Sequence, residues 1–372
     1  MTGILIELAI VLIGLAVTAV LFHRFPVLPA VHHREERFPS VSVIIPARDE
    51  EKNLPLLLAD LSAQTLPPHE ILCVDDASED TTAQITLAHG ATLISLCDMP
   101  EGWTGKTLAC QSGADAASGD LLLFLDADVR LGRDGIQKLM QAYLENKCTV
   151  SVQPYHHTEK LYEQLSMLFN LVQVGANGTT LPMPQNIGLY GPVILMARSD
   201  YAAVGGHKSV RKCVVEDMAL GMRLKKAGLP YRLYIGDKDI SFRMYAGGLR
   251  SLLQGWLKNM AAGAVRTPMP VFCMVFFWIA SLASVPLQIV KFALAGNLPW
   301  LLLYSALYIV WVSILMVLAR RVGRFRVEAI VVYPIGMLVL LCVFAVSAIR
   351  RLFGLGAVWK GRIIEVEGKP CD

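Results

Sequence analysis

The chain has 372 residues, of which 54% are hydrophobic and only 17% are charged. This balance excludes an ordinary soluble domain and indicates a membrane protein with one sizeable soluble part. The formal net charge is only +3 and the sequence has no long basic run, so the sequence indicates no nucleic-acid partner.

The chain begins with an apolar run, residues 4–22, of the length of a membrane helix. Its start is not basic and no small-residue cleavage site follows it, so we expect an uncleaved anchor rather than a secretory signal peptide. Arg24, Arg34 and Arg37 come next. By the positive-inside rule they place the following domain in the cytosol.

Strand-like and helix-like patterns alternate after the anchor. Residues 41–46, 70–75 and 121–125 predict buried strands, and residues 49–63 and 78–88 predict helices. Strands that alternate with helices in this way predict an α/β domain with a mainly parallel sheet. Ligands of such sheets bind at the C-terminal ends of the strands. The residues at these ends are therefore candidate site residues.

Carboxylates follow the ends of two of these strands. Asp126 and Asp128 come after residues 121–125, and Asp76 follows residues 70–75. Carboxylates at i and i+2 can ligate one hard divalent cation and leave positions for phosphate oxygens, so that the ion neutralises a departing diphosphate. The alternative is an ordinary turn, where Asp is common. Asp76 has the same two interpretations, as a ligand of a base or ribose or as a turn residue.

Lys106 stands at the start of a predicted helix, in a stretch that partly matches a phosphate loop. The Walker pattern requires glycine where this chain has Pro100, so a P-loop is excluded. The lysine can still bind phosphate with helix-end amides, or it is a surface lysine. Glu216 and Asp217 begin another helical stretch, where an acidic pair either provides a general base or compensates the helix dipole.

The C-terminal third contains further candidate membrane helices. Three apolar runs reach the ~20 residues that a bilayer requires: residues 271–290, 300–318 and 329–348. Basic clusters precede and follow the last run. The positive-inside rule places both clusters in the cytosol, but one full span separates them, so a simple count of spans conflicts with the rule. Either one run is interfacial or re-entrant, or the tail departs from the charge rule. Residues 250–258 predict an interfacial helix, and residues 205–207 (Gly-Gly-His) predict a turn that could line a sugar pocket.

In their order along the chain, these motifs resemble the inverting, metal-dependent GT-A glycosyltransferases of family 2. The resemblance covers residues 41 to about 259 and depends on four motifs: residues 46–50, 74–78, 126–128 and 216–217. Within the family, the chain is similar to the bacterial carotenoid-acid glycosyltransferases, the 4,4'-diaponeurosporenoate glycosyltransferases of staphyloxanthin-type pathways. That similarity depends on one N-terminal anchor with about three C-terminal membrane helices, and on residues 103–106, 254–259 and 359–362.

The resemblance implies a role for each candidate residue. The general base would be Asp217, and the metal ligand, for Mg or Mn, would be Asp128. The nucleotide-sugar contacts would be Glu50, Asp76, Lys106 and Asp126. The acceptor or product side would involve Glu216, Gln254, Trp256 and Lys258. Many relatives have Gln-x-x-Arg-Trp near the membrane, and this chain departs from that pattern because tryptophan precedes the basic residue.

The resemblance also implies a domain organisation and a reaction. The expected segments are a membrane anchor (1–25), a GT-A catalytic domain (38–245), an interfacial amphipathic segment (246–268), transmembrane helices (269–348) and a basic tail (349–372). The expected reaction is inverting transfer of a hexose, glucose from UDP-glucose, to a carotenoid acid such as 4,4'-diaponeurosporenoate. The protein would be a multi-pass protein of the cell membrane, with its catalytic domain in the cytoplasm. The alternatives are another lipid acceptor (polyprenyl phosphate, diacylglycerol, a hopanoid or a sterol-like alcohol) and an inactive membrane scaffold.

Overall fold

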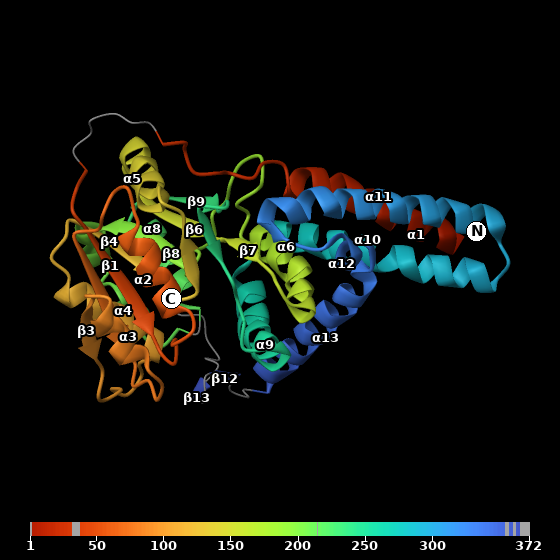
Figure 1. Cartoon of the computed structure of the whole chain (residues 1–372). Coiled ribbons are helices and arrows are strands. Elements are labelled where there is room, and N and C mark those ends of the chain that lie inside the picture. The colour runs from red at the N-terminus through yellow and green to blue at the C-terminus, as the bar shows by residue number, and fades with distance from the viewer. Residues whose placement is uncertain (1, 32–37, 214, 354–356, 360–361, 365–372) are drawn as a thin grey trace. The chain divides into compact units, whose positions relative to one another are not determined.

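The computed structural model describes residues 2–31, 38–213, 215–353, 357–359 and 362–364 (Figure 1). The contacts divide the chain into two compact units. We call the first, Met1–Phe25, His157–Gln185 and Tyr245–Leu355, the helical unit, and the second, Pro26–His156, Asn186–Met244 and Gly356–Asp372, the sheet unit. Each unit draws on segments that are far apart in the sequence.

The sheet unit is built on a seven-stranded sheet. In spatial order its strands are β3 (Thr92–Ser95), β2 (Glu70–Asp75), β1 (Val41–Ala47), β4 (Leu121–Leu125), β8 (Val193–Ala197), β6 (Thr149–Gln153) and β9 (Tyr231–Ile235). Neighbouring strands are parallel from β3 to β4 and again between β6 and β9. Only β8 runs against both of its neighbours. The prediction of an α/β domain with a mainly parallel sheet is confirmed.

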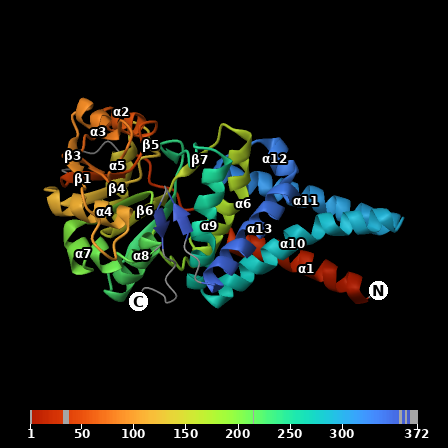
Figure 2. The same cartoon turned by 90° about the horizontal axis from the view of Figure 1, so that it is seen from below.

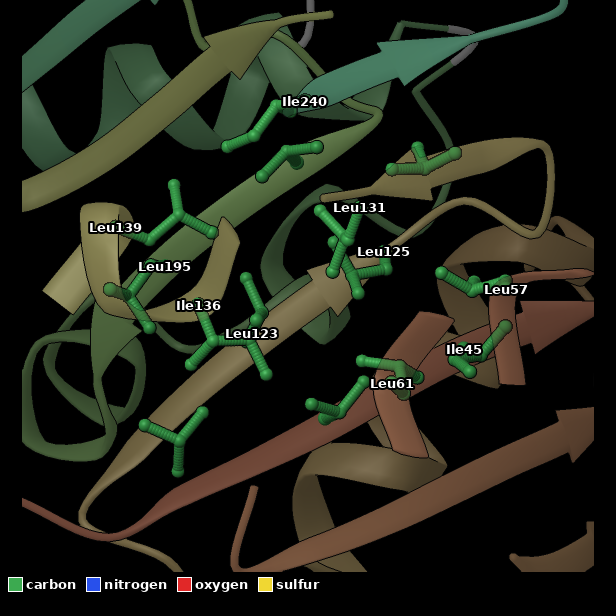
Figure 3. Close-up of a cluster of buried hydrophobic side chains, with 14 of the residues drawn as sticks. Ile45, Leu57, Leu61, Leu123, Leu125, Leu131, Ile136, Leu139, Leu195 and Ile240 are labelled. Atoms are coloured by element: carbon green, nitrogen blue, oxygen red, sulfur yellow. The ribbon is translucent and has the colours of Figure 1, made fainter. Parts of the chain in front are cut away.

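Six α-helices accompany this sheet among the described residues: α2 (Leu54–Ser62), α3 (Thr82–Ala88), α4 (Gly105–Ala116), α5 (Gly135–Asn146), α7 (Arg198–Ala203) and α8 (Glu216–Lys226). A single 3₁₀ turn, η2 (His207–Val210), lies between the last two. Successive side chains of a strand point to opposite faces. Ile44 and Val74 meet Gly113 of α4 on one face, and Ile45 lies in a cluster with residues of α2 and α5 on the other (Figure 3). Helices therefore cover both faces, as the apolar strand sequences require.

Two predicted helices begin later than the sequence pattern indicated. The predicted helix 49–63 starts only at Leu54, and the predicted helix 78–88 starts at Thr82. Asp49 has a φ of 51°. Its carboxylate accepts a hydrogen bond from the backbone N–H of Glu79 at 2.9 Å, and Oγ of Ser78 accepts one from the N–H of Asp49 at 2.9 Å. These short polar side chains bind backbone groups and hold the two segments together as turns instead of helical first turns.

A second sheet of the unit contains β5 (Val129–Leu131), β7 (Tyr155–His157) and β10 (Ile240–Phe242). The strand β5 follows β4 after a short turn, so the residues between these two strands are fixed at both ends. Near the C-terminus, β12 (Ala357–Trp359) and β13 (Arg362–Ile364) pair antiparallel. The remaining residues of the basic tail beyond Phe353 lie outside the described part of the chain, as do Arg34 and Arg37.

The helical unit contains the 3₁₀ helix η1 (Leu161–Leu165), the two-residue strand β11 (Gly323–Arg324), and seven α-helices among its described residues. The helices are α1 (Thr2–Leu21), α6 (Ser166–Ala176), α9 (Leu249–Arg266), α10 (Met269–Leu294), α11 (Leu298–Val322), α12 (Val327–Val331) and α13 (Tyr333–Leu352). In the described chain, α1, α10, α11 and α13 are long and apolar enough to cross a membrane. The predicted run 329–348 becomes the short α12 and the longer α13, which has a proline in its first turn.

The helices α1 and α10 lie side by side in the helical unit (Figure 2). A Cβ atom on Gly14 would lie 2.1 Å from Cβ of Ser281, so only glycine fits at this crossing. Oγ of Ser281 donates a hydrogen bond to the backbone oxygen of Val11 at 3.1 Å. Nζ of Lys291 lies 3.3 Å from the Glu7 carboxylate. A small residue and interhelical polar contacts are the usual means by which membrane helices associate.

Candidate active site

The candidate site lies where β1, β2 and β4 end. The backbone N–H of Asp76 donates to the carbonyl of Ala47 at 2.9 Å, so the residue after β2 is held against the end of β1. The N–H of Asp126 donates to the carbonyl of Pro192 at 3.0 Å and fixes the residue after β4 in the same way. Parallel strands thus bring predicted site residues from separate motifs to one edge of the sheet.

Lys106 connects two of the predicted motifs. It lies in the first turn of α4, which Thr104 and Thr107 cap reciprocally. Its Nζ is 2.6 Å from Oδ1 of Asp126 and 3.5 Å from Oε1 of Glu216. Burial lowers the pKa of Lys106, but the charges of the two carboxylates outweigh this effect and hold the pKa well above its ordinary value. The lysine is therefore fully charged at neutral pH, and it is not a free surface lysine.

Asp217 is the second residue of α8, next to Glu216. Its Oδ2 accepts a hydrogen bond from the N–H of Gly191 at 2.8 Å, and its Oδ1 accepts one from the N–H of Met218 at 2.8 Å. A Cβ on Gly191 would lie 2.7 Å from Oδ2, so glycine allows this close approach. Burial and the charge of Glu216 raise the pKa of Asp217 to about 6, against the opposing charge of Lys106. A carboxylate with a pKa near neutrality is suited to accept a proton.

Asp126 and Asp128 flank the buried Ala127 directly after β4. Both side chains are half-buried. The carbonyl of Asp126 accepts a hydrogen bond from the N–H of Val129 at 3.1 Å, and the carbonyl of Asp128 accepts one from the N–H of Arg243 at 3.3 Å. The described residues contain no group of three or more His, Cys, Asp or Glu side chains that could hold a metal ion. A pair of carboxylates without a third protein ligand still matches the way in which Mg²⁺ is held by one or two carboxylates and substrate phosphates.

The predicted nucleoside contacts lie on the turns after β1 and β2. Asp76 is 8% exposed, and its Oδ2 lies 3.7 Å from Nη1 of Arg48, which also donates to the Asp76 carbonyl at 3.1 Å. Oε2 of Glu50 accepts a hydrogen bond from Nδ2 of Asn53 at 2.8 Å. The carboxylate of Asp80 accepts hydrogen bonds from the N–H groups of Thr82 and Glu51, so it connects the two turns. Arg48 was not among the predicted residues, and its place beside Asp76 becomes clear only in three dimensions.

His207 is a second residue near the site to which the sequence analysis gave no role of its own. The predicted turn is confirmed, because Gly205 and Gly206 have φ angles of 75° and 55°. His207 itself is only 2% exposed, and its Nδ1 lies 2.9 Å from the hydroxyl of Tyr201. Burial lowers the pKa of His207 to about 4, although the charge of Glu216 acts in the opposite direction. The imidazole is therefore neutral at pH 7. The one signal in the sequence was a histidine after two glycines and before an acidic pair.

The predicted acceptor-side residues Gln254, Trp256 and Lys258 belong to α9 of the helical unit. Gln254 and Lys258 are half-buried. Trp256 is 3% exposed and stacks on Phe169, with ring centroids 4.6 Å apart and planes at 24°. The ring of Tyr245 approaches it edge-on at 5.9 Å. In the described part of the chain, ion pairs join the predicted site residues Lys106, Asp126 and Glu216 to one another, and Asp76 pairs with Arg48.

Comparison with known proteins identifies the relatives of this chain. The model of the family described as Glycosyl transferase family 2 matches residues 42–200. The 4,4'-diaponeurosporenoate glycosyltransferase of Staphylococcus haemolyticus is 34% identical over 344 residues, which cover 89% of this chain and 90% of that protein. The protein of the same name from Staphylococcus aureus (strain USA300) is 34% identical over 336 residues, or 87% and 88% of the two chains.

Among solved structures, the mannosyltransferase PcManGT from Pyrobaculum calidifontis in complex with GDP-Man and Mn²⁺ has a similar fold. The TM-score is 0.50 at 17% sequence identity, and the match covers 88% of this chain and 99% of that chain. The mixed α/β sheet unit is therefore a GT-A fold. The relatives and the mannosyltransferase match nearly the whole chain, so the similarity includes both units.

Proposed function

This chain belongs to glycosyl transferase family 2, and from that premise we propose that it transfers glucose from UDP-glucose to a carotenoid acid such as 4,4'-diaponeurosporenoate. The transfer inverts the anomeric carbon and takes place at the cytoplasmic face of the cell membrane. The observation that carries this proposal is the match over almost the full chain to two 4,4'-diaponeurosporenoate glycosyltransferases. Among the described residues, the chain also has four helices long and apolar enough to cross a membrane, which an enzyme acting on a lipid requires.

In the proposed reaction, the acceptor oxygen attacks the anomeric carbon of the sugar while the diphosphate leaves on the opposite side. Glu50 and Asp76 hold the nucleoside, and Asp126 and Lys106 hold the nucleotide side. The ammonium of Lys106 is fully charged and fixed by its ion pairs, so it can oppose the negative charge of the diphosphate. Preorganised charge of this kind commonly contributes more to the rate enhancement of an enzyme than any other single effect.

We propose that Asp128 ligates a divalent cation, Mg or Mn, together with phosphate oxygens of the donor. The residues fit such an ion, because hard cations prefer carboxylate oxygen and the Asp128 side chain is half-buried at a strand end. When bound, the ion would supply Lewis-acid stabilisation of the departing diphosphate. The mannosyltransferase with the similar fold was solved with GDP-Man and Mn²⁺, which supports this assignment.

The role of Asp217 depends on the acceptor. An alcohol must lose a proton during attack, and in this proposal Asp217 accepts it, as its raised pKa supports. A carboxylic acid has a pKa near ~4 and is already ionised at pH 7, so no proton needs to leave. Toward a carotenoid acid, Asp217 therefore orients the acceptor instead of deprotonating it. Glu216, Gln254, Trp256 and Lys258 are proposed for the acceptor or product side.

Expression in cells that make the unglycosylated carotenoid acid tests the proposal directly. We expect mass spectrometry of lipid extracts to show one hexose added to the acid, and isolated membranes to require UDP-glucose for this product. The control is the same chain with Asp217→Asn and Asp128→Asn combined, which should insert normally and give no product. A hexose found instead on a polyprenyl phosphate, diacylglycerol, hopanoid or sterol-like alcohol would replace the proposed acceptor.

A further inference from the structure

A short segment beside the candidate site carries three cations. We call residues 208–212 the basic segment, because it contains Lys208, Arg211 and Lys212. The two lysines are exposed and the arginine is half-buried. Across the part of the chain that the structure describes, none of the three forms an ion pair. Three positive charges therefore lie within five residues, each without an ion-pair partner in the described chain.

Buried apolar side chains hold the basic segment in one orientation. Val210 and Cys213 point inward, are 1% and 2% exposed, and pack against Ala219 of α8. Arg211 follows directly after this turn, and its Nη1 donates to the carbonyl of Lys208 at 3.5 Å. The side chain of Arg211 therefore folds back toward Lys208.

Hydrogen bonds tie the basic segment to α4. The N–H of Lys208 donates to Oε1 of Gln111 at 2.8 Å, and Oγ1 of Thr107 donates to the carbonyl of Arg211 at 3.2 Å. A Cβ atom on Gly102 would lie 3.0 Å from Cε of Lys212, so this lysine lies along the turn that precedes α4. The segment is thus anchored next to Lys106 at one end and leads into Glu216 at the other.

The side chains next to this segment carry more negative than positive charge. Lys106 contributes one ammonium, while Asp126, Glu216 and Asp217 contribute three carboxyl groups. An acceptor that is itself a carboxylate would be repelled on its approach to this group of acids. A neutral acceptor would not be repelled. A second set of cations, separate from Lys106, would remove this difficulty for an anionic acceptor.

We propose that the basic segment is the recognition site for the anionic headgroup of the acceptor, and that it selects a carboxylate over an alcohol of the same skeleton. The inference rests on the proposed function, because the proposed function places the acceptor beside Asp217. The cations act at a distance on the approaching anion and raise its local concentration at the site. The donor is bound by Lys106 and by the residues that follow β1, β2 and β4, and not by the basic segment.

The test compares two polyenes that differ only in their headgroup. Retinoic acid and retinol share one skeleton, and their binding to the purified full chain in neutral detergent can be followed by quenching of tryptophan fluorescence. The variant replaces Lys208, Arg211 and Lys212 together by Gln. The matched control replaces three other exposed lysines of the sheet unit, Lys225, Lys226 and Lys238, by Gln. Binding of UDP to each protein is measured in parallel.

We expect the native chain and the control to prefer retinoic acid, and the variant to bind retinoic acid on the order of tenfold more weakly with retinol unchanged. The preference of the native chain should also weaken at high salt. If UDP binding weakens while retinoic acid binding is unchanged, the segment serves the donor and the inference is wrong. If neither ligand is affected, the segment is only a solvated surface.

Two further measurements distinguish failure of the inference from misfolding of the variant and from failure of the proposed reaction. If the triple variant unfolds at a lower temperature than the control, Lys208→Gln and Lys212→Gln are tested singly, since both side chains are exposed. Binding does not require turnover, so a failure of the proposed reaction would show as a lack of hexose transfer with the headgroup preference still present. If the native chain does not prefer retinoic acid over retinol, the inference is wrong, whereas the proposed reaction is not affected.

Discussion

Lys106 and Asp126 form an ion pair with 2.6 Å between Nζ and Oδ1, and the same ammonium lies 3.5 Å from Glu216. One side chain from the first turn of α4 thus joins the residue that follows β4 to the first residue of α8. Removing the lysine would leave both carboxylates without this partner, with Glu216 still beside Asp217. The charge balance of the site therefore depends strongly on one residue.

Substituting Lys106 should shift the pH dependence of the reaction. The charge of Lys106 lowers the pKa of Asp217, so Lys106→Met should raise that pKa further. A general base works only when ionised, and the activity toward an alcohol acceptor should then require a higher pH than in the native enzyme. Rate profiles between pH 4.5 and 9 measure the shift, with ~1 pH unit as a rough expectation. Lys226→Met, on the exposed end of α8, is the control and should leave the profile unchanged.

Asp217→Asn should affect two acceptors by different amounts. General-base assistance contributes ~10²–10⁴-fold, and only where a proton must leave. Transfer to an alcohol analogue should therefore fall by such a factor, while transfer to the carboxylate of the same skeleton falls much less. In the native enzyme, the rate with the alcohol should decline as the pH drops through about 6, because Asp217 becomes protonated there. Equal losses for both acceptors would show that Asp217 is not a selective general base.

Asp128→Asn should abolish transfer by removing the proposed metal ligand. Lewis-acid stabilisation is worth several kcal/mol, so we expect a loss of about a hundredfold or more. Excess chelator should inactivate the native enzyme, and Mn²⁺ or Mg²⁺ should restore it. Binding of Mn²⁺ by electron paramagnetic resonance in the presence of UDP gives a readout that does not depend on turnover. Full activity of the variant in chelator would refute the metal assignment.

Trp256→Ala should lower the stability of the helical unit. The side chain is 3% exposed and stacks on Phe169, and truncation of a buried aromatic residue costs about 3–5 kcal/mol. Trp256→Phe should retain most of the stacking, and Asn259→Ala, at an exposed position of α9, should have little effect. Thermal unfolding in detergent measures these differences. A Trp256→Ala variant of native stability but with a raised acceptor KM would instead favour the proposed contact with the acceptor.

The proposed cytoplasmic orientation can be tested with Cys97. This cysteine is exposed, whereas Cys110, in α4, is buried and a poor target for labelling. An impermeant maleimide should label Cys97 in inside-out vesicles and not in right-side-out vesicles. The Cys97→Ser variant identifies the signal that belongs to this residue, because Cys273 and Cys342 are also free. Labelling of Cys97 only from the outer side would reverse the proposed topology.

Sequence patterns were sufficient for much of the sheet but not for the turns around it. The predicted strands 70–75 and 121–125 match β2 and β4 residue for residue, because an apolar run bounded by polar residues has few alternatives. The starts of α2 and α3 were placed too early, since Asp49 and Ser78 look like favourable first-turn residues. Their side chains bind the backbone of the opposite turn instead.

The candidate residues could be named from their motifs, but their mutual contacts could not. No spacing in the sequence indicates that Lys106 bridges Asp126 and Glu216, because that contact depends on how α4 and α8 pack. His207 shows the same limit. A histidine after two glycines is consistent with an exposed turn, and only its packing against Phe124 and the hydroxyl of Tyr201 makes it a buried, neutral residue.

The crossing of Gly14 and Ser281 imposes an order on biogenesis. Protein synthesis proceeds at about 5–20 residues per second, so α10, which begins at Met269, emerges on the order of ten to fifty seconds after α1 ends at Leu21. During that interval the first helix lacks the partner on which Gly14 packs, and Glu7 has no lysine beside it. Most of the GT-A fold is translated in the same interval. The nascent chain therefore has to complete its catalytic part while its first membrane helix is still unassembled.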